Sequence, residues 1–110
     1  MNINTEKKNE VIICHIDGDI NINTSPQLRK AFEEFVEKDM KKIIVDFSSV
    51  SYIDSSGLAT FIELLQRLKK SGGSFRICSM NQKVKNIFEV TKLHKIFEIF
   101  DTQSSAENNF

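Results

Sequence analysis

The sequence lacks any segment suited to entering a membrane. No run approaches the ~20 consecutive apolar residues that a helix needs to cross a bilayer. The N-terminal stretch MNINTEKKNE has no apolar centre of the kind that a secretory leader carries. We therefore expect no membrane association and a soluble, cytoplasmic protein.

The sequence also lacks an excess of charge of either sign. Fifteen Lys and Arg residues balance fifteen Asp and Glu residues, so neither the basic surface of a nucleic-acid-binding protein nor an acidic tail is present. Cysteine is scarce, and Cys14 and Cys78 each lie within an apolar run. That placement favours buried free thiols in a reducing compartment over a disulfide. We expect a protein or small-molecule partner and no nucleic acid.

Glycine and histidine are too few, or wrongly spaced, for three common kinds of site. The four glycines, two of them adjacent, provide no GxxxxGK[ST] phosphate-binding loop. His15 and His94 have no spacing that suggests a triad with a serine and an aspartate. Neither the histidines nor the cysteines show the spacing of metal ligands. The sequence therefore predicts no catalytic residue, no cofactor and no metal.

What the sequence does contain is an alternation of strands with amphipathic helices. Apolar residues recur at helical spacing between the short apolar runs VIICHI, KKIIVDF, SFRIC and KIFEIF. The predicted order is an edge strand over 1–5 that turns back at 7–10, strands over 11–16, 41–47, 74–78 and 95–100, and helices within 24–38, 58–70 and 84–91. Ser25 before Pro26, or Thr24 before Gln27, is expected to cap the first helix.

This order predicts an α/β fold with a mixed, mostly parallel sheet. The length of 110 residues is typical of one domain with one continuous core. We expect a single domain over 1–110, with its core at about 11–100 and a polar terminal segment, or a frayed helix, at 101–110. The residues expected to be buried between helices and sheet are Leu28, Phe32, Phe35, Leu58, Phe61, Ile62, Leu65, Ile13, Ile44, Val45 and Ile77.

The stretch YIDSSGLATF (52–61) places polar residues between an apolar strand and the second long helix. In mostly parallel sheets, functional residues gather in such loops at the carboxyl ends of strands. Three interpretations are open. Asp54, Ser55 or Ser56 caps the helix; a serine acts as a nucleophile, although no glycine precedes it as in a hydrolase elbow; or a serine accepts a phosphoryl group that blocks a docked partner.

Longer motifs carry a resemblance to a known family. With DGDIN before the first helix, the segment IIVDFSSVSYIDSSGLATF closely resembles the bacterial anti-sigma factor antagonists of the STAS (sulfate transporter and anti-sigma antagonist) domain family. The resemblance extends from about residue 11 to residue 100. It implies a STAS-like four- or five-stranded mixed sheet with helices packed mainly on one face. It also implies a non-enzymatic protein that binds an anti-sigma factor, usually itself a serine kinase of the histidine-kinase-like ATPase fold, and so frees a sigma factor.

The resemblance also implies which residues form the site. Ser55 is the first hydroxyl residue after the motif aspartate and so the expected phosphorylation site, from which a dedicated serine phosphatase removes the phosphate. Asn21 stands where family members often carry an acidic residue; it keeps a hydrogen-bonding side chain but lacks the charge. The expected partner-binding residues are Asp19, Asn21, Asn23, Asp54, Ser55, Ser56 and Gly57.

Two alternatives to this function stay open at the level of sequence. The chain could be a STAS binding subunit of another signalling or transport assembly, with no role for a sigma factor. A chain of 110 residues without membrane segments argues against a domain attached to an anion transporter. The alternative from another class is an enzyme that uses Ser55 or Ser56 as a nucleophile, which a fluorophosphonate probe would label.

Overall fold

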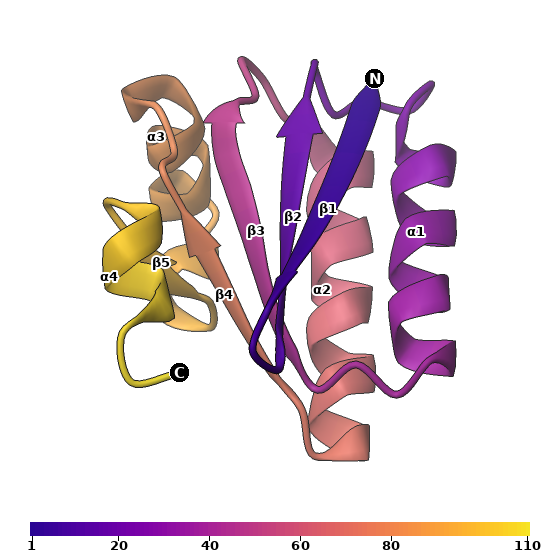
Figure 1. Cartoon of the computed structure of the whole chain (residues 1–110). Helices are drawn as coiled ribbons and strands as arrows, with labels where there is room; N and C mark the ends of the chain where they lie inside the picture. The colour runs from indigo at the N-terminus through magenta and orange to yellow at the C-terminus, as the bar shows by residue number, and fades with distance from the viewer.

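The computed structural model describes residues 1–110 and confirms the alternation of strands and helices (Figure 1). The elements are β1 (Asn2–Lys8), β2 (Val11–Asp17), α1 (Ser25–Glu37), β3 (Lys42–Ser49), α2 (Ser55–Ser71), β4 (Ser74–Cys78), α3 (Gln82–Val90), the 3-10 helix η1 (Leu93–Lys95), β5 (Glu98–Phe100) and α4 (Gln103–Glu107). The prediction of a last strand from Lys95 was too long, because η1 occupies Leu93–Lys95 and the strand begins at Glu98.

The five strands form one mixed sheet in their order along the chain. Only β1 is antiparallel to its neighbour, since a tight turn joins it to β2; the other neighbouring pairs are parallel. The carboxyl ends of β2, β3 and β4 therefore meet at one edge, where the chain enters α1, α2 and α3 (Figure 1). This edge carries the candidate site.

The two sides of the sheet are covered unequally, as the predicted fold class requires. In Figure 1, α2 lies behind the sheet with α1 beside it on the right, and the short α4 packs on the other side of the sheet against β3, β4 and β5. Because side chains alternate along a strand, Val45 faces the large core under the helices while the neighbouring Ile44 faces α4. Ile13 faces α4 as well. The prediction that Ile13 and Ile44 pack against the long helices was wrong, although both are buried.

The C-terminal segment is ordered against the sheet rather than frayed. Ala106 of α4 is fully buried with Ile13, Ile44 and Cys78. Arg76 of β4 secures the segment, because its Nη1 donates to the carbonyl oxygens of Ala106 at 2.9 Å and Asn108 at 3.0 Å. Sequence reasoning missed this packing because the segment itself is almost entirely polar.

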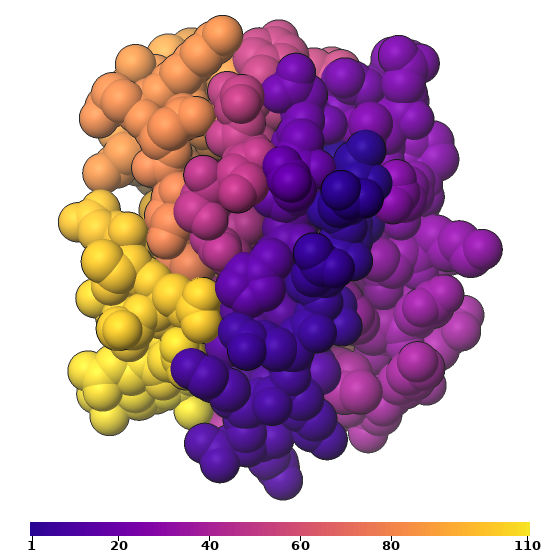
Figure 2. Space-filling model, turned by 45° about the horizontal axis from the view of Figure 1, so that its top comes forward, coloured from indigo at the N-terminus to yellow at the C-terminus, as the bar shows by residue number.

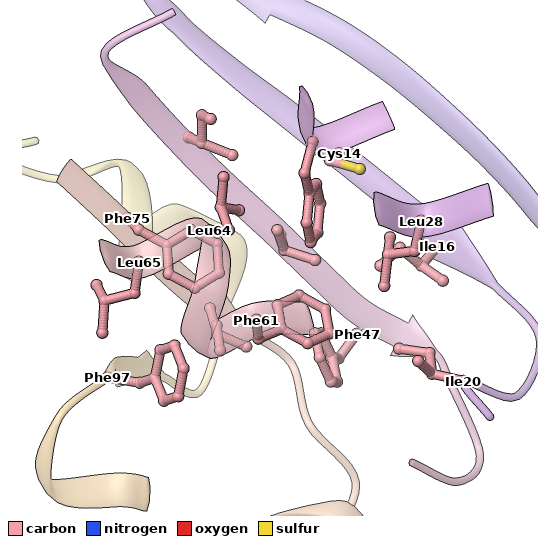
Figure 3. Close-up of a cluster of buried hydrophobic side chains, with 14 of the residues drawn as sticks. Cys14, Ile16, Ile20, Leu28, Phe47, Phe61, Leu64, Leu65, Phe75 and Phe97 are labelled. Carbon is pink, nitrogen blue, oxygen red and sulfur yellow. The ribbon is translucent and has the colours of Figure 1, made fainter. Parts of the chain in front are cut away.

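Phenylalanine rings join the large core into one unit. Phe61 of α2 lies at its centre, with ring centroids of Phe32 at 5.3 Å, Phe47 at 5.2 Å and Phe75 at 6.1 Å (Figure 3). The other residues of the predicted set that face these helices are buried, except for Phe35 and Ile62, which are only partly buried at the margin. Leu64 of α2, which the prediction omitted, is buried in their place. The core thus ties both long helices to the sheet.

Truncation of the central ring should be the most damaging change in this core. Phe61→Ala should lower the free energy of unfolding by about 3–5 kcal/mol, the usual loss for a buried Phe, because it removes contacts to α1 and to two strands at once. Phe35→Ala, at the partly buried margin of the same core, should cost clearly less. Denaturant unfolding of both variants measures the difference; equal losses would contradict the central position of Phe61.

A charged network lies on the α4 side of the sheet. His15 of β2 donates from Nδ1 to Oδ2 of Asp46 at 2.6 Å and from Nε2 to Oε1 of Glu6 at 3.0 Å. An imidazole that donates from both nitrogens must be protonated. Partial burial opposes this charge, but the hydrogen bonds to Asp46 and Glu6 outweigh burial and raise the pKa of His15. The network therefore stabilises the hairpin of β1 and β2 most when His15 is charged.

The sign of the pH dependence follows from this raised pKa. Protonation of His15 contributes its full stability below the ordinary histidine pKa of about 6.5, and the contribution is lost as pH rises through the higher value in the fold. Since His15 is partly exposed, solvent screening limits the effect to about 1 kcal/mol. Thermal unfolding between about pH 6 and pH 8 should show a smaller decline in His15→Gln than in the wild type. The exposed His94→Gln serves as the control, and an unchanged decline in His15→Gln would contradict the network.

Candidate functional site

Two loops lie side by side at the carboxyl edge of the sheet. Loop A (residues 18–24) joins β2 to α1, and loop B (residues 50–54) joins β3 to α2. Ile20 and Ile53 form a parallel β-bridge, and the Ile20 N–H donates to the carbonyl oxygen of Tyr52 at 2.9 Å. The segments leading into the two long helices are therefore neighbours at this edge. Backbone hydrogen bonds set their spacing.

The Asp54 side chain closes the N-terminus of α2 and reaches across to loop A. Its Oδ1 accepts hydrogen bonds from the N–H of Ser56 at 3.0 Å, the N–H of Gly57 at 3.1 Å and the hydroxyl of Ser56 at 2.6 Å. Its Oδ2 accepts from the N–H of Ile22 at 3.1 Å. The bond from the Ser56 hydroxyl is the main reason that the pKa of Asp54 lies below its ordinary value, and the backbone N–H groups add to it. Asp54 is therefore a charged carboxylate that joins both loops.

Ser55 is the first residue of α2, and it is exposed. Its hydroxyl takes no part in the cap, whose hydrogen bonds come from Ser56 and Gly57. The N-terminus of a helix carries the positive end of the helix dipole and favours negative charge. The site therefore presents an accessible hydroxyl that the fold does not use, at a place where added negative charge is tolerated.

Gly57 allows the first turn of α2 to lie directly on the bridge between the loops. A β-carbon at this position would stand 2.5 Å from Cγ2 of Ile20 and 2.7 Å from Cγ1 of Ile53, closer than real β-carbons approach other atoms. Any larger residue would push α2 away from the bridge. This close approach brings the first turn of α2, with Ser55, next to loop A.

The start of α1, which follows loop A, differs from the prediction. Neither Thr24 nor Ser25 caps the helix with its side chain: Thr24 holds the cap position without such a bond. Instead Oδ1 of Asn21 accepts from the N–H of Asn23 at 2.9 Å and of Thr24 at 3.2 Å. Asn21 thus closes a turn that precedes the helix, a conformation that asparagine side chains favour. The predicted cap was wrong because the chain already turns three residues before Thr24.

Ser25 connects the starts of the two long helices instead. Its Oγ lies 2.7 Å from the carbonyl oxygen of Asn21 and 2.9 Å from Oγ of Ser56. Ser56 donates its one hydroxyl proton to Asp54, and Ser25 has one proton to share between the Asn21 carbonyl oxygen and Oγ of Ser56. Spacing along the chain predicted only a capping role for Ser25, because it does not reveal that Ser25 and Ser56 are neighbours in space.

A third loop completes the edge. Loop C (residues 79–81) joins β4 to α3, and its Asn81 donates from Nδ2 to the carbonyl oxygen of Val50 in loop B at 3.1 Å. The Lys83 ammonium of α3 lies 5.2 Å from the centre of the Tyr52 ring. In Figure 2 the segments near residues 20, 50 and 80 lie next to one another across one face, in purple, magenta and orange. Sequence reasoning missed loop C, although an asparagine three residues before apolar Val84 is a capping signal.

The seven residues predicted to bind a partner occupy loops A and B and the first turn of α2. Three of them, Asp19, Asn23 and Ser55, are exposed, and Gly57 is buried. The others are partly buried within the hydrogen-bond network: Asn21, Asp54 and Ser56. The structure thus brings all seven together, with some side chains on the surface and others supporting it from beneath.

Other chemistry-bearing groups are not assembled into a site. No three His, Cys, Asp or Glu side chains are grouped so as to hold a metal ion. Cys14 and Cys78 are free and buried, as predicted. Burial raises the pKa of Cys14 to about 12 and that of Cys78 to about 11, which keeps both thiols protonated and unreactive. None of the helices has both the length and the apolar character needed to cross a membrane.

The structure is an α/β domain with a five-stranded mixed sheet and helices mainly on one side. Loops form its candidate binding surface, and a DSSG turn begins the second long helix. The chain belongs to the STAS domain family, whose family model matches residues 2–106. The predicted family and fold class are confirmed.

Individual relatives within this family are named anti-sigma factor antagonists. An anti-sigma-B factor antagonist of Bacillus subtilis is 34% identical over 103 residues, which cover 90% of this chain and 92% of that protein. The crystal structure of TM1081 from Thermotoga maritima has a TM-score of 0.90 at 32% identity and covers 94% of this chain and 90% of that chain. SpoIIAA of Bacillus, solved in its phosphorylated form, has a TM-score of 0.74 at 18% identity, covers 96% of each chain, and shows a shared fold alone. The chain is thus a member of the anti-sigma factor antagonists, a family of regulatory binding domains.

Proposed function

We propose that the chain is a phosphorylation-switched anti-sigma factor antagonist. In its unmodified form it binds an anti-sigma factor that is also a serine kinase, and so frees a sigma factor. The observation that carries the proposal is Ser55: an exposed hydroxyl at the start of α2 that makes none of the hydrogen bonds of the helix cap. The proposal includes a cytoplasmic location, where sigma factors act on RNA polymerase, and no enzymatic activity of the chain itself.

The modification is a phosphoryl transfer from ATP. The Ser55 Oγ attacks the γ-phosphorus, a new P–O bond forms, the bond to ADP breaks and the hydroxyl proton is released. A serine phosphatase reverses the step by transferring the phosphoryl group to water. The phosphate adds a charge of about −1.5 to −2 at neutral pH. Because Ser55 lies outside the cap, this charge meets no buried group and leaves the fold intact.

Binding, in contrast, should be sensitive to the phosphate. A partner that covers loops A and B must remove water from Ser55, and a doubly charged group resists that removal. One relative supports the choice of partner by name: the Bacillus subtilis protein, 34% identical to this chain, is an anti-sigma-B factor antagonist.

We predict that a negative charge at Ser55 weakens binding to the anti-sigma factor but leaves the stability of the fold unchanged. Ser55→Asp should unfold within about 0.5 kcal/mol of the wild type, as an exposed substitution does. It should bind the cognate anti-sigma factor about 2–5 kcal/mol more weakly, the scale of a broken desolvated contact. Ser55→Ala should still bind but accept no phosphate. Ser104→Asp is the matched control, because Ser104 is an exposed serine in the first turn of α4, on the other side of the sheet.

The measurements are calorimetric binding to the purified anti-sigma factor, thermal unfolding, and mass spectrometry after incubation with that protein and ATP. Phosphate on Ser55, absent from the Ser55→Ala variant, is the expected result. If Ser55 stays unmodified and Ser55→Asp binds as tightly as Ser104→Asp, the switch is refuted. In that case Ser55 is a helix-terminus residue only, and the chain is a binding subunit of another assembly.

A further inference from the structure

Large apolar side chains are exposed at four positions, and two of these lie in the loops around Ser55. Ile22 of loop A is 72% exposed and Tyr52 of loop B is 40% exposed. The other two lie elsewhere. Val90, which is 82% exposed, is the last residue of α3, and Ile96, which is 48% exposed, comes directly after η1. Exposed apolar residues scattered singly are ordinary on protein surfaces, whereas grouped ones mark interaction sites. Ile22 and Tyr52 lie in loops that the Ile20–Ile53 bridge joins directly before the Ser55 turn, and this places them at the candidate site.

Both side chains project from a fixed backbone. The N–H of Ile22 is held by Oδ2 of Asp54, and the carbonyl oxygen of Tyr52 accepts from the N–H of Ile20. The Lys83 ammonium lies over the Tyr52 ring, 5.2 Å from its centroid, at a distance that favours a cation–π contact. A loop backbone that is ordered in advance loses little entropy when a partner binds, so less of the binding free energy is spent on ordering the loops.

We propose that Ile22 and Tyr52 are the two apolar anchors through which the anti-sigma factor docks, and that its facing surface is apolar with a carboxylate opposite Lys83. This inference rests on the proposed function and adds the chemistry of the partner surface. The same hydrogen-bond network joins Ile22, Tyr52 and the Asp54 cap beside Ser55, so a protein that covers Ser55 also covers both anchors.

The arrangement also explains why phosphate at Ser55 acts so strongly. Apolar anchors bind only when water leaves their surroundings. A phosphate at Ser55, next to Asp54, keeps its hydration shell in the region that both anchors need to desolvate. The carboxylate expected opposite Lys83 would also meet the added negative charge, and the two would repel each other.

The test uses single variants of the full chain and the purified kinase that phosphorylates Ser55. Ile22→Ala and Tyr52→Ala should each raise the dissociation constant about tenfold or more, as anchor residues do. Tyr52→Phe keeps the ring and should bind within about threefold of the wild type. Val90→Ala is the matched control, an exposed apolar residue away from Ser55, and should leave binding unchanged. Thermal unfolding of each variant checks that the fold is retained.

The outcomes separate this inference from the function on which it rests. If the wild type binds and phosphorylation of Ser55 abolishes binding, yet Ile22→Ala and Tyr52→Ala bind like Val90→Ala, the anchors are refuted and the switch stands. If the wild type binds no such kinase, both proposals fail. If the two variants lose self-association in sedimentation instead of kinase binding, the occupant of the surface is a second copy of the chain, and the inference is overturned.

Discussion

One carboxylate joins the starts of the two long helices at the carboxyl edge of the sheet, in addition to the backbone bridge between their loops. Asp54 caps α2 through the N–H groups of Ser56 and Gly57 and, with its second oxygen, holds the N–H of Ile22 in loop A. A cap that served α2 alone would need only one of these oxygens. Because Asp54 uses both, the start of α2 and the segment before α1 cannot move independently. The surface around Ser55 is therefore rigid although it consists of loops.

Two adjacent serines have different roles: Ser56 supports the fold, and Ser55 is accessible at the surface. Ser56 is bound to Asp54 and Ser25, whereas Ser55, one residue earlier, turns outward at the first position of α2. Gly57 makes this possible, since its missing side chain lets α2 settle on the bridge between the loops. A modification of Ser55 therefore alters the surface without disturbing the hydrogen bonds that hold it. This separation is what a reversible switch requires of its fold.

Much of this architecture could be predicted from the sequence because it depends on local patterns. Helical spacing placed Phe61 in the core, and DSSG after an apolar strand located Ser55. Contacts between segments distant in the chain could not be predicted in the same way. The continuous apolar run of β3 does not reveal which side Ile44 faces, and a polar C-terminal segment does not reveal that Arg76 will bind its carbonyl groups. The turn that Asn21 closes was missed because loop A turns before the helix begins.

The same distinction applies to the candidate site. The position of Ser55 follows from a short motif, but the shape of the surface around it depends on bonds between loops, such as the one from Ile22 to Asp54. Whether this one carboxylate holds both loops is tested most directly by residue-resolved amide hydrogen exchange of Asp54→Ala. The N–H of Ile22 should lose protection together with those of Ser56 and Gly57, while the N–H of Val84, capped by Asn81, should keep its protection. Unchanged protection at Ile22 would show that Asp54 does not hold loop A.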